Sequence, residues 1–148
     1  RPVRPLIVGG VELDSNWPMG PVAHSDGDVL YHAITDALLG ALSLPDIGQL
    51  FPDNAAENDN RNSAHFVKAA LAKVVAAGYT IGNLDCTVIL ERPKISPHKL
   101  VIRENIAKLL KISVDQVNLK GKTHERVDAV GEGRAVEAHV VVLLVKKG

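Results

Sequence analysis

The sequence predicts a single α+β domain in which one mixed β-sheet carries helices on one face. Three observations support this prediction. Apolar residues recur at helical spacing in three segments, and alternating or nearly continuous apolar residues mark strands around them. The 148 residues suffice for one hydrophobic core and contain no internal repeat or linker. We therefore interpret residues 1–148 as one domain.

Composition and charge exclude several classes of protein. The chain is 46% hydrophobic but only 3% aromatic, so its core must be built from Val, Leu, Ile and Ala. Its 17 acidic and 17 basic residues cancel, so electrostatics gives no case for a nucleic acid or an anionic membrane as partner. The single cysteine, Cys86, excludes an internal disulfide and fits a reducing compartment. No apolar run approaches the roughly 20 residues that span a bilayer, so we expect a soluble protein.

A hairpin and a helix are expected first. Residues 5–13 have the pattern of a strand, a Gly9-Gly10 turn and a second strand. After a loop, residues 23–41 open with polar groups and continue as an apolar helix. Ser25 or Asp26 is expected to cap this helix, and Asp28 in its first turn suits the positive end of the helix dipole.

Loops and a second helix follow. Residues 44–53 are too rich in Pro, Gly and Asp for regular structure. Residues 54–62 should be exposed, either as a lid over a site or as an inert loop. Ser63 should cap a helix that ends near Ala77, just before Gly78.

Strands dominate the remainder. We expect strands at 84–90 and 117–122, with a proline-stiffened loop at 91–98 and a helix at 99–110 between them. A final strand at 135–145 is nearly all apolar in its second half, so it should be central or buried on both faces. The sheet face without helices then needs a cover, and oligomerisation through the sheet is the simplest one.

The helix after residue 28 carries the clearest chemical pattern. Asp28, His32 and Asp36 are spaced four residues apart and so share one helix face. A histidine with a carboxylate one turn away on either side can be oriented to leave one nitrogen free for a metal. The alternative is a solvated helix face. His24, just before the helix, is well placed to meet an anion.

Three loops carry further polar groups. Asp46 and Asp53 could bind hydroxyls or a metal, or could serve turn formation alone. The proline-stiffened loop at 91–98 leaves backbone groups available for hydrogen bonding, which suits recognition of a base edge. The alternative is a plain connection between a strand and a helix. Residues 123–125 offer a hydroxyl, an imidazole and a carboxylate, which are reasonable ligands for a phosphate and its cation.

Four groups of motifs stand in a fixed order along the chain. They are AHSDGD at 23–28 with His32 and Asp36, DIG at 46–48 with FPD at 51–53, RPK at 92–94 with Pro97-His98, and THE at 123–125 with GEG at 131–133. In order and spacing they resemble the 2-C-methyl-D-erythritol 2,4-cyclodiphosphate synthases, the cyclising enzymes of the non-mevalonate isoprenoid pathway. The resemblance covers nearly the whole chain.

The resemblance implies an α+β homotrimer with its sheets around the threefold axis and active sites between neighbouring subunits. It implies a phosphorus–oxygen lyase. The 2-phosphate of 4-diphosphocytidyl-2-C-methyl-D-erythritol 2-phosphate attacks the β-phosphorus, CMP leaves, and the cyclic diphosphate forms. Nucleophile and electrophile are both anionic, so catalysis should be mostly alignment and charge neutralisation.

The resemblance also implies roles for individual residues. His32 is implied as a ligand of zinc, and Glu125 as a ligand of Mg²⁺ or Mn²⁺ at the substrate diphosphate. His24 and Thr123 are implied as catalytic. His24 would stabilise the transition state, and Thr123 would hold a phosphate. Asp36 as a partner that orients His32 is our own inference. The implied substrate-binding set is His24, Ser25, Asp46, Ile47, Gly48, Phe51, Pro52, Asp53, Lys122, Thr123, His124 and Glu125. The implied cytidine-binding set is Leu90, Pro93, Lys94, Ile95 and Ser96.

Two positions depart from the family pattern. Family members begin with a strand that carries Asp-x-His, which supplies two more metal ligands, and no such motif precedes Gly9-Gly10 here. We expect that strand to be missing from the chain as given. Val130 stands where bacterial members often carry an Arg that lines an axial cavity for isoprenoid diphosphates, so that ligand is not carried over.

The segments KTHE and ISPHK resemble those of plastid-type members, which favours a plastid over a bacterial cytoplasm as the location. Two rival functions stay open. One is a catalytically dead trimeric scaffold that keeps the fold and the cytidine pocket. The other is a metal-dependent phosphohydrolase that uses water as its nucleophile.

Overall fold

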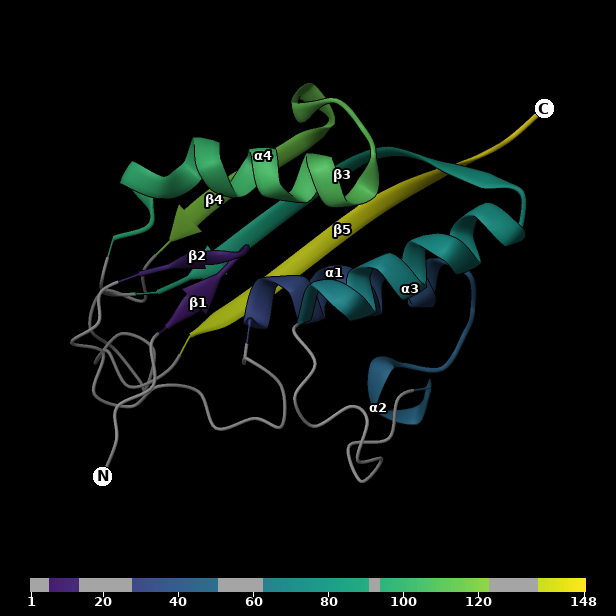
Figure 1. Cartoon of the computed structure of the whole chain (residues 1–148), viewed down its shortest axis with the longest axis horizontal. Helices are drawn as coiled ribbons and strands as arrows, with labels where there is room; N and C mark the ends of the chain where they lie inside the picture. Colours follow the sequence, from purple (N-terminus) through teal and green to yellow (C-terminus); the bar gives the residue numbers. More distant parts are fainter. Residues whose placement is uncertain (1–5, 14–27, 51–62, 91–93, 123–135) are drawn as a thin grey trace.

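A mixed sheet forms one layer of the molecule and helices form the other (Figure 1). The structure is a computed structural model and describes residues 6–13, 28–50, 63–90, 94–122 and 136–148. The sheet order is β4-β3-β5, with β3 parallel to β4 and antiparallel to β5. Its strands are β3 Tyr79–Ile89, β4 Val117–Lys122 and β5 Glu137–Lys146. The longer helices are α1 Val29–Ala41, α3 Ser63–Ala76 and α4 Lys99–Leu110. The predicted mixed α+β architecture is confirmed.

The predicted hairpin forms a second sheet of its own. Strands β1 Ile7–Val8 and β2 Val11–Glu12 pair antiparallel with each other and not with the other described strands, so the expectation of a single sheet was wrong. Gly9 and Gly10 have φ of 57° and 77°, the left-handed pair that a two-residue hairpin turn requires. A Cβ on Gly9 would also collide with Ile102, so glycine is needed for space as well.

The Asp28 carboxylate ties this hairpin to the first helix. Its Oδ atoms accept from the backbone N–H groups of Gly9 at 3.0 Å, Gly10 at 2.8 Å and Tyr31 at 3.0 Å. Asp28 is fully buried and is the N-cap of α1, so the predictions that Ser25 or Asp26 caps this helix and that Asp28 lies in its first turn were wrong. Asp28 takes the cap position because its side chain there satisfies backbone donors of two elements at once.

A short helix, α2 Ile47–Leu50, lies in the segment that we expected to be irregular. The Asp46 carboxylate accepts from Gln49 N–H at 3.1 Å, and the Asp46 carbonyl accepts from the N–H groups of Gln49 and Leu50. An aspartate placed to cap a single helical turn therefore outweighs the turn-forming composition.

The second helix ends close to the expected position. Helix α3 stops at Ala76, and Gly78 follows with φ of 85°. Ser63 is the first residue of α3 rather than the residue before it, so its predicted place as the cap was off by one.

Strand β3 begins five residues earlier than the predicted strand at 84–90. Its register with β5 runs from Tyr79 opposite Lys146 to Ile89 opposite Glu137, with an irregularity between Ile81 and Asn83. Two 3₁₀ helices, Ser96–His98 and Val114–Gln116, lie in the connections. Gln116 donates from Nε2 to the carbonyls of Ile81 and Gly82 at 3.1 and 2.9 Å. These bonds satisfy carbonyls beside the irregularity, which the alternation of side chains alone does not predict.

Strand β5 lies at the edge of the sheet among the described strands, so the expectation that it is central was wrong. Its residues alternate. Ala138, Val140, Val142 and Leu144 pack against the core, whereas Val141, Leu143 and Val145 are 72, 58 and 47% exposed. The expectation that both faces are buried therefore fails for the single chain, and its second face is an exposed apolar stripe.

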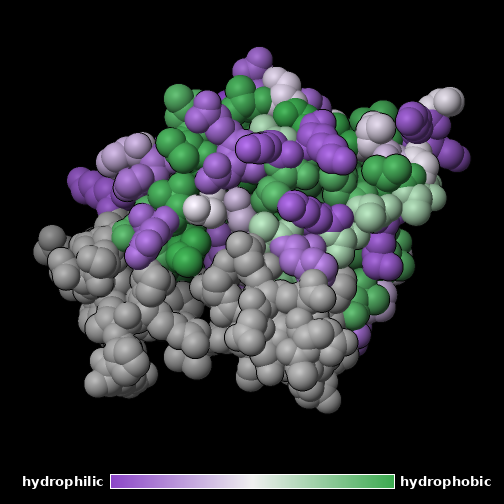
Figure 2. All heavy atoms as spheres, in the orientation of Figure 1, coloured by the Kyte–Doolittle hydropathy of each residue, from purple (hydrophilic) through white to green (hydrophobic). Residues whose placement is uncertain are grey.

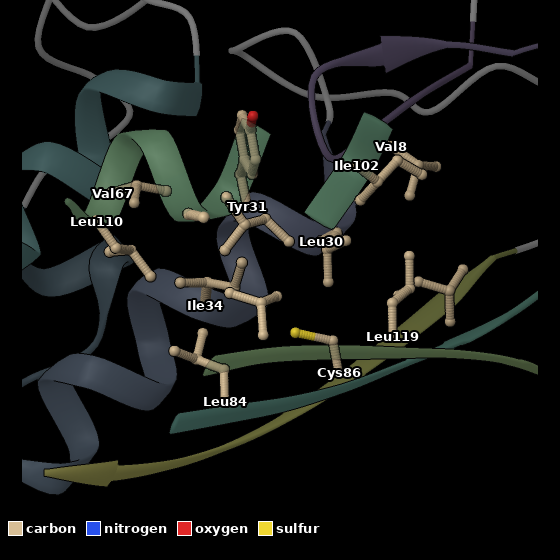
Figure 3. Close-up of a cluster of buried hydrophobic side chains, with 14 of the residues drawn as sticks. Val8, Leu30, Tyr31, Ile34, Val67, Leu84, Cys86, Ile102, Leu110 and Leu119 are labelled. Carbon is tan, nitrogen blue, oxygen red and sulfur yellow. The ribbon is translucent and has the colours of Figure 1, made fainter. Parts of the chain in front are cut away.

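The core lies between the helices and the sheet (Figure 3). Leu30 and Ile34 of α1 and Ile102 of α4 face Leu84 and other residues of the sheet, and each of these four is at most 1% exposed. Full burial of such a side chain contributes about 1.5–3 kcal/mol. Burial also raises the pKa of the Cys86 thiol to about 12, so this thiol stays protonated at neutral pH. Among the described helices, none combines the length and apolarity that a bilayer crossing requires.

We expect Asp28→Asn to lower the free energy of unfolding by about 2 kcal/mol, because an amide nitrogen would face backbone donors in a buried site. Urea unfolding followed by circular dichroism measures the change. The matched control is Asp115→Asn on an exposed 3₁₀ turn, which should stay within about 0.5 kcal/mol of the parent. Equal midpoints for Asp28→Asn and the control would contradict this role.

Candidate functional site

His32 lies one turn into α1 and is half-buried between two helices. Its Nε2 lies 3.0 Å from Ser63 Oγ, and Ser63 itself is fully buried at the start of α3. The ring of Phe66 meets the imidazole edge-on, with 6.2 Å between the ring centroids. A hydroxyl and an aromatic ring from α3 therefore hold this imidazole in place.

An open groove of about 650 Å³ runs between α1 and the first half of β5. His32 and Asp36 line it from the helix, and Ala138 and His139 line it from the strand. Asp36 is exposed on α1, four residues after His32, as the spacing predicts. Asp28 does not share this exposed face, because it is fully buried with its carboxylate on backbone N–H groups.

A second group of predicted residues meets at the ends of β3 and β4. The backbone N–H of Leu90 donates to the carbonyl of Lys122 at 2.9 Å, just after Ile89 pairs with Lys122. The two strands are parallel, so both of their carboxyl ends open at this end of the sheet. Val88 also pairs with Ala138, which lines the His32 groove. Both groups therefore lie at the same end of the sheet.

Ile95 anchors the predicted cytidine segment to β4. It is 6% exposed, whereas Lys94 and Ser96 on either side of it are exposed. A Cβ added to Gly121 would collide with Cγ2 of Ile95, so the missing side chain at residue 121 makes room for this isoleucine. The segment thus lies over the end of β4 with Lys94 and Ser96 facing outward.

Other predicted residues lie elsewhere. Asp46 comes just before α2, and Gly48 lies within it. This helix follows the C-terminal end of α1, whereas His32 lies near the N-terminal end of α1. Of Ile47 we describe the backbone alone, as the first residue of α2. His24, Ser25, Phe51, Pro52, Asp53, Pro93, Thr123, His124 and Glu125 lie outside the described residues.

Sequence reasoning missed three residues at this end of the sheet. Ser63 was expected only as a helix cap, and nothing in its local pattern links it to a histidine 31 residues away. His139 was interpreted only as part of an apolar strand. In the structure it lines the groove, and its Nε2 lies 3.2 Å from the Glu137 carboxylate. Gly121 could have been found, because an isolated glycine within a strand pattern indicates a close approach.

The described residues offer the imidazoles of His32 and His139, the carboxylates of Asp36 and Glu137, and the lysines Lys94 and Lys122 at or near one end of the sheet. Lysine ammonium groups can neutralise an anionic ligand, and an imidazole can hold a metal. Among the described residues, no three His, Cys, Asp or Glu side chains cluster as a metal site. The described residues alone therefore do not complete a metal site, and the His32 imidazole could supply one ligand to such a site.

Comparison with known proteins identifies a family that this chain matches. Residues 1–145 match the model of the YgbB family. A relative from Arabidopsis thaliana named 2-C-methyl-D-erythritol 2,4-cyclodiphosphate synthase, chloroplastic, is 55% identical over 147 residues, which is 99% of this chain. The chain spans 63% of the length of that relative.

Similarity extends to bacterial proteins and to solved structures. A synthase of the same enzyme name from Rhodopirellula baltica is 46% identical over 146 residues, covering 99% of this chain and 87% of the relative. A structure described as IspF (Plasmodium falciparum) CDP complex has a TM-score of 0.85 and 40% identity, and the match covers 98% of this chain and 86% of that one.

We expect Gly121→Ala to displace Ile95 and destabilise the protein by about 1–3 kcal/mol, because the added methyl group overpacks the contact. Urea unfolding and the methyl NMR signals of Ile95 measure the two effects. Gly40→Ala within α1 is the matched control, since a Cβ added there would meet no atom within 4 Å beyond its own helix backbone. This control should stabilise the helix by up to about 1 kcal/mol. An unshifted Ile95 signal in Gly121→Ala would refute the contact.

Proposed function

The chain belongs to the YgbB family, and on that premise we propose that its full-length protein is a 2-C-methyl-D-erythritol 2,4-cyclodiphosphate synthase. The observation that carries this proposal is the 55% identity across 99% of the chain to a relative of that name. The adjoining ends of β3 and β4 support it from the geometry, because Leu90 is bonded to Lys122 there and Ile95 lies against Gly121. The substrate is 4-diphosphocytidyl-2-C-methyl-D-erythritol 2-phosphate.

The reaction is an intramolecular phosphoryl transfer. An oxygen of the 2-phosphate bonds to the β-phosphorus, the bond from that phosphorus to the bridging oxygen breaks, and CMP leaves with that oxygen. Both reacting groups are anions in one molecule, so the protein must align them and offset their repulsion. In our proposal Lys122 supplies positive charge beside the phosphates. The cytidine is bound by Leu90, Pro93, Lys94, Ile95 and Ser96. His24, Thr123 and the remaining implied substrate-binding residues keep their proposed roles.

Divalent metals belong to this proposal. We propose His32 as one ligand of zinc and Glu125 as a ligand of Mg²⁺ or Mn²⁺. A bound cation would supply charge neutralisation at the diphosphate. The half-buried position of His32 against Ser63 supports a fixed ring, and Asp36 lies one turn away in the same groove.

A homotrimer is the proposed assembly. Val141, Leu143 and Val145 form an exposed apolar stripe on the sheet face that the helices leave uncovered. In a trimer with its sheets around the threefold axis, these stripes would cover one another, and active sites would lie between subunits. A position for α2 in a neighbouring subunit's site would then explain why Asp46 lies away from His32.

A plastid is the proposed location, with a bacterial cytoplasm as the alternative. The chloroplastic relative from Arabidopsis thaliana is 55% identical, against 46% for the relative from Rhodopirellula baltica.

We expect the full-length protein to convert the substrate into CMP and a cyclic diphosphate. Phosphorus NMR measures the product directly, because both phosphorus atoms of the ring couple to each other and neither is a terminal monophosphate. An open, hydrolysed product would instead indicate the phosphohydrolase. Binding of CDP without any conversion would indicate the scaffold.

We expect Asp36→Ala to weaken zinc binding by about 10–100-fold, because loss of a group that orients a ligating histidine has effects of this size. Equilibrium dialysis of the full-length protein measures the affinity. Asp115→Ala removes an exposed carboxylate elsewhere and should leave the affinity unchanged. Parent-like zinc affinity in Asp36→Ala would show that Asp36 does not support His32.

A further inference from the structure

A second hollow lies on the helix layer, between α3 and α4. It encloses about 940 Å³ and is open to solvent along one side. In the area between these two helices, Figure 2 shows hydrophobic residues flanked by hydrophilic ones. The lining residues on α3 recur at helical spacing, so one face of this helix forms a wall of the groove. They are Ala64, Lys68, Leu71, Ala72, Val75 and Ala76.

Much of the lining of this α3–α4 groove is apolar, although Tyr31 and Asn105 add polar groups to it. Leu71 and Leu109 lie half-buried on either side of it, and Val75 is 63% exposed, the second most exposed large apolar side chain among the described residues. Ala72 and Ala76 are small and leave space for an occupant to approach the helix. An apolar surface of this kind is favourable for a hydrocarbon chain, because contact removes it from water.

Lysines supply all the charge among the described lining residues. Lys68 stands on α3, Lys108 on α4 and Lys111 at the C-cap of α4. Because the whole chain has no formal net charge, attraction of an anion to the groove must come from these lysines and not from the overall charge of the protein. A ligand that matches it must carry negative charge beside an apolar body.

Lys111 adds an independent observation. Its φ is 58°, the left-handed conformation that closes a helix and that glycine adopts without strain. The chain places a long cationic side chain at this position, and that side chain lines the groove. Helix termination alone does not explain a lysine here, because glycine would serve it better.

We propose that the α3–α4 groove binds a single-chain amphiphile with an anionic carboxylate or phosphate head group. The hydrocarbon chain lies on Leu71, Val75 and Leu109, and the lysines hold the head group. The volume fits the range of about 300–1,000 Å³ that is usual for small-molecule sites. The lining is too small for a stable protein partner, which needs about 20–30 residues on each side. The groove lies on the helix layer, away from the exposed stripe of β5, so this site does not depend on the proposed function.

Titration calorimetry of the full-length protein below micelle-forming concentrations tests the proposal. Dodecanoate and dodecyl phosphate are the probes and distinguish the two head groups, and binding of either supports the site. Dodecyltrimethylammonium has the same chain with a cationic head and should bind at least about tenfold more weakly, because like charges repel. Equal affinity for the cationic amphiphile would overturn the proposal.

Variants locate the site. Lys68→Glu combined with Lys108→Glu should weaken dodecanoate binding by about tenfold or more, and Lys111→Gly by about threefold while the fold becomes no less stable. Lys73→Glu is the matched control, since Lys73 is exposed on α3 but does not line the groove, and it should change affinity by less than about twofold. An equal loss in Lys73→Glu, or an acidic amphipathic peptide that binds where dodecanoate does not, would overturn the proposal.

Discussion

The buried carboxylate of Asp28 is the interaction on which the arrangement of this protein most depends. It receives backbone N–H groups from the hairpin turn and from the first turn of α1. Asn105 of α4 donates from Nδ2 to the carbonyl of Gly9 at 2.9 Å, so a second helix is also bonded to this turn. Three elements are therefore joined through one two-residue turn. A buried carboxylate with fewer donors would be costly, and buried donors without it would be equally so.

This junction also determines where His32 lies. The imidazole is one helical turn beyond the cap, so any shift of the cap would move it relative to Ser63 and β5. The structural role of Asp28 and the chemical role that we propose for His32 are thus separate but coupled through α1. Asp28 and Asp36 therefore have different uses: Asp28 is buried at the N-cap of α1 and serves the structure, whereas Asp36 is exposed and lines the groove.

Local patterns predicted the parts of the fold that local interactions decide. The hairpin follows from Gly9-Gly10, and α3 and α4 follow from apolar periodicity with a glycine or a change of pattern at their ends. The edge position of β5 could not be predicted, because an apolar strand has the same pattern whether the fold or an assembly covers it. Helix α2 was missed because one aspartate cap outweighed its composition. The motifs suggested candidate site residues one by one, but the contact of His32 with Ser63 joins two helices and cannot be seen in the local pattern of either.

The pairing of β3 with β5 has a consequence for how the protein is made. Helix α1 packs against β5, although β3, α4 and β4 lie between them in the chain, so α1 is synthesised well before this partner. During synthesis β3, α4 and β4 can form their parallel unit first, while the apolar face of α1 waits for its partner. Strand β3 can pair with β5 only after residues 137–146 have left the ribosome. A chain stalled or cut short before residue 137 would expose both the edge of β3 and the buried stripe of α1, and so become a substrate for chaperones and proteases.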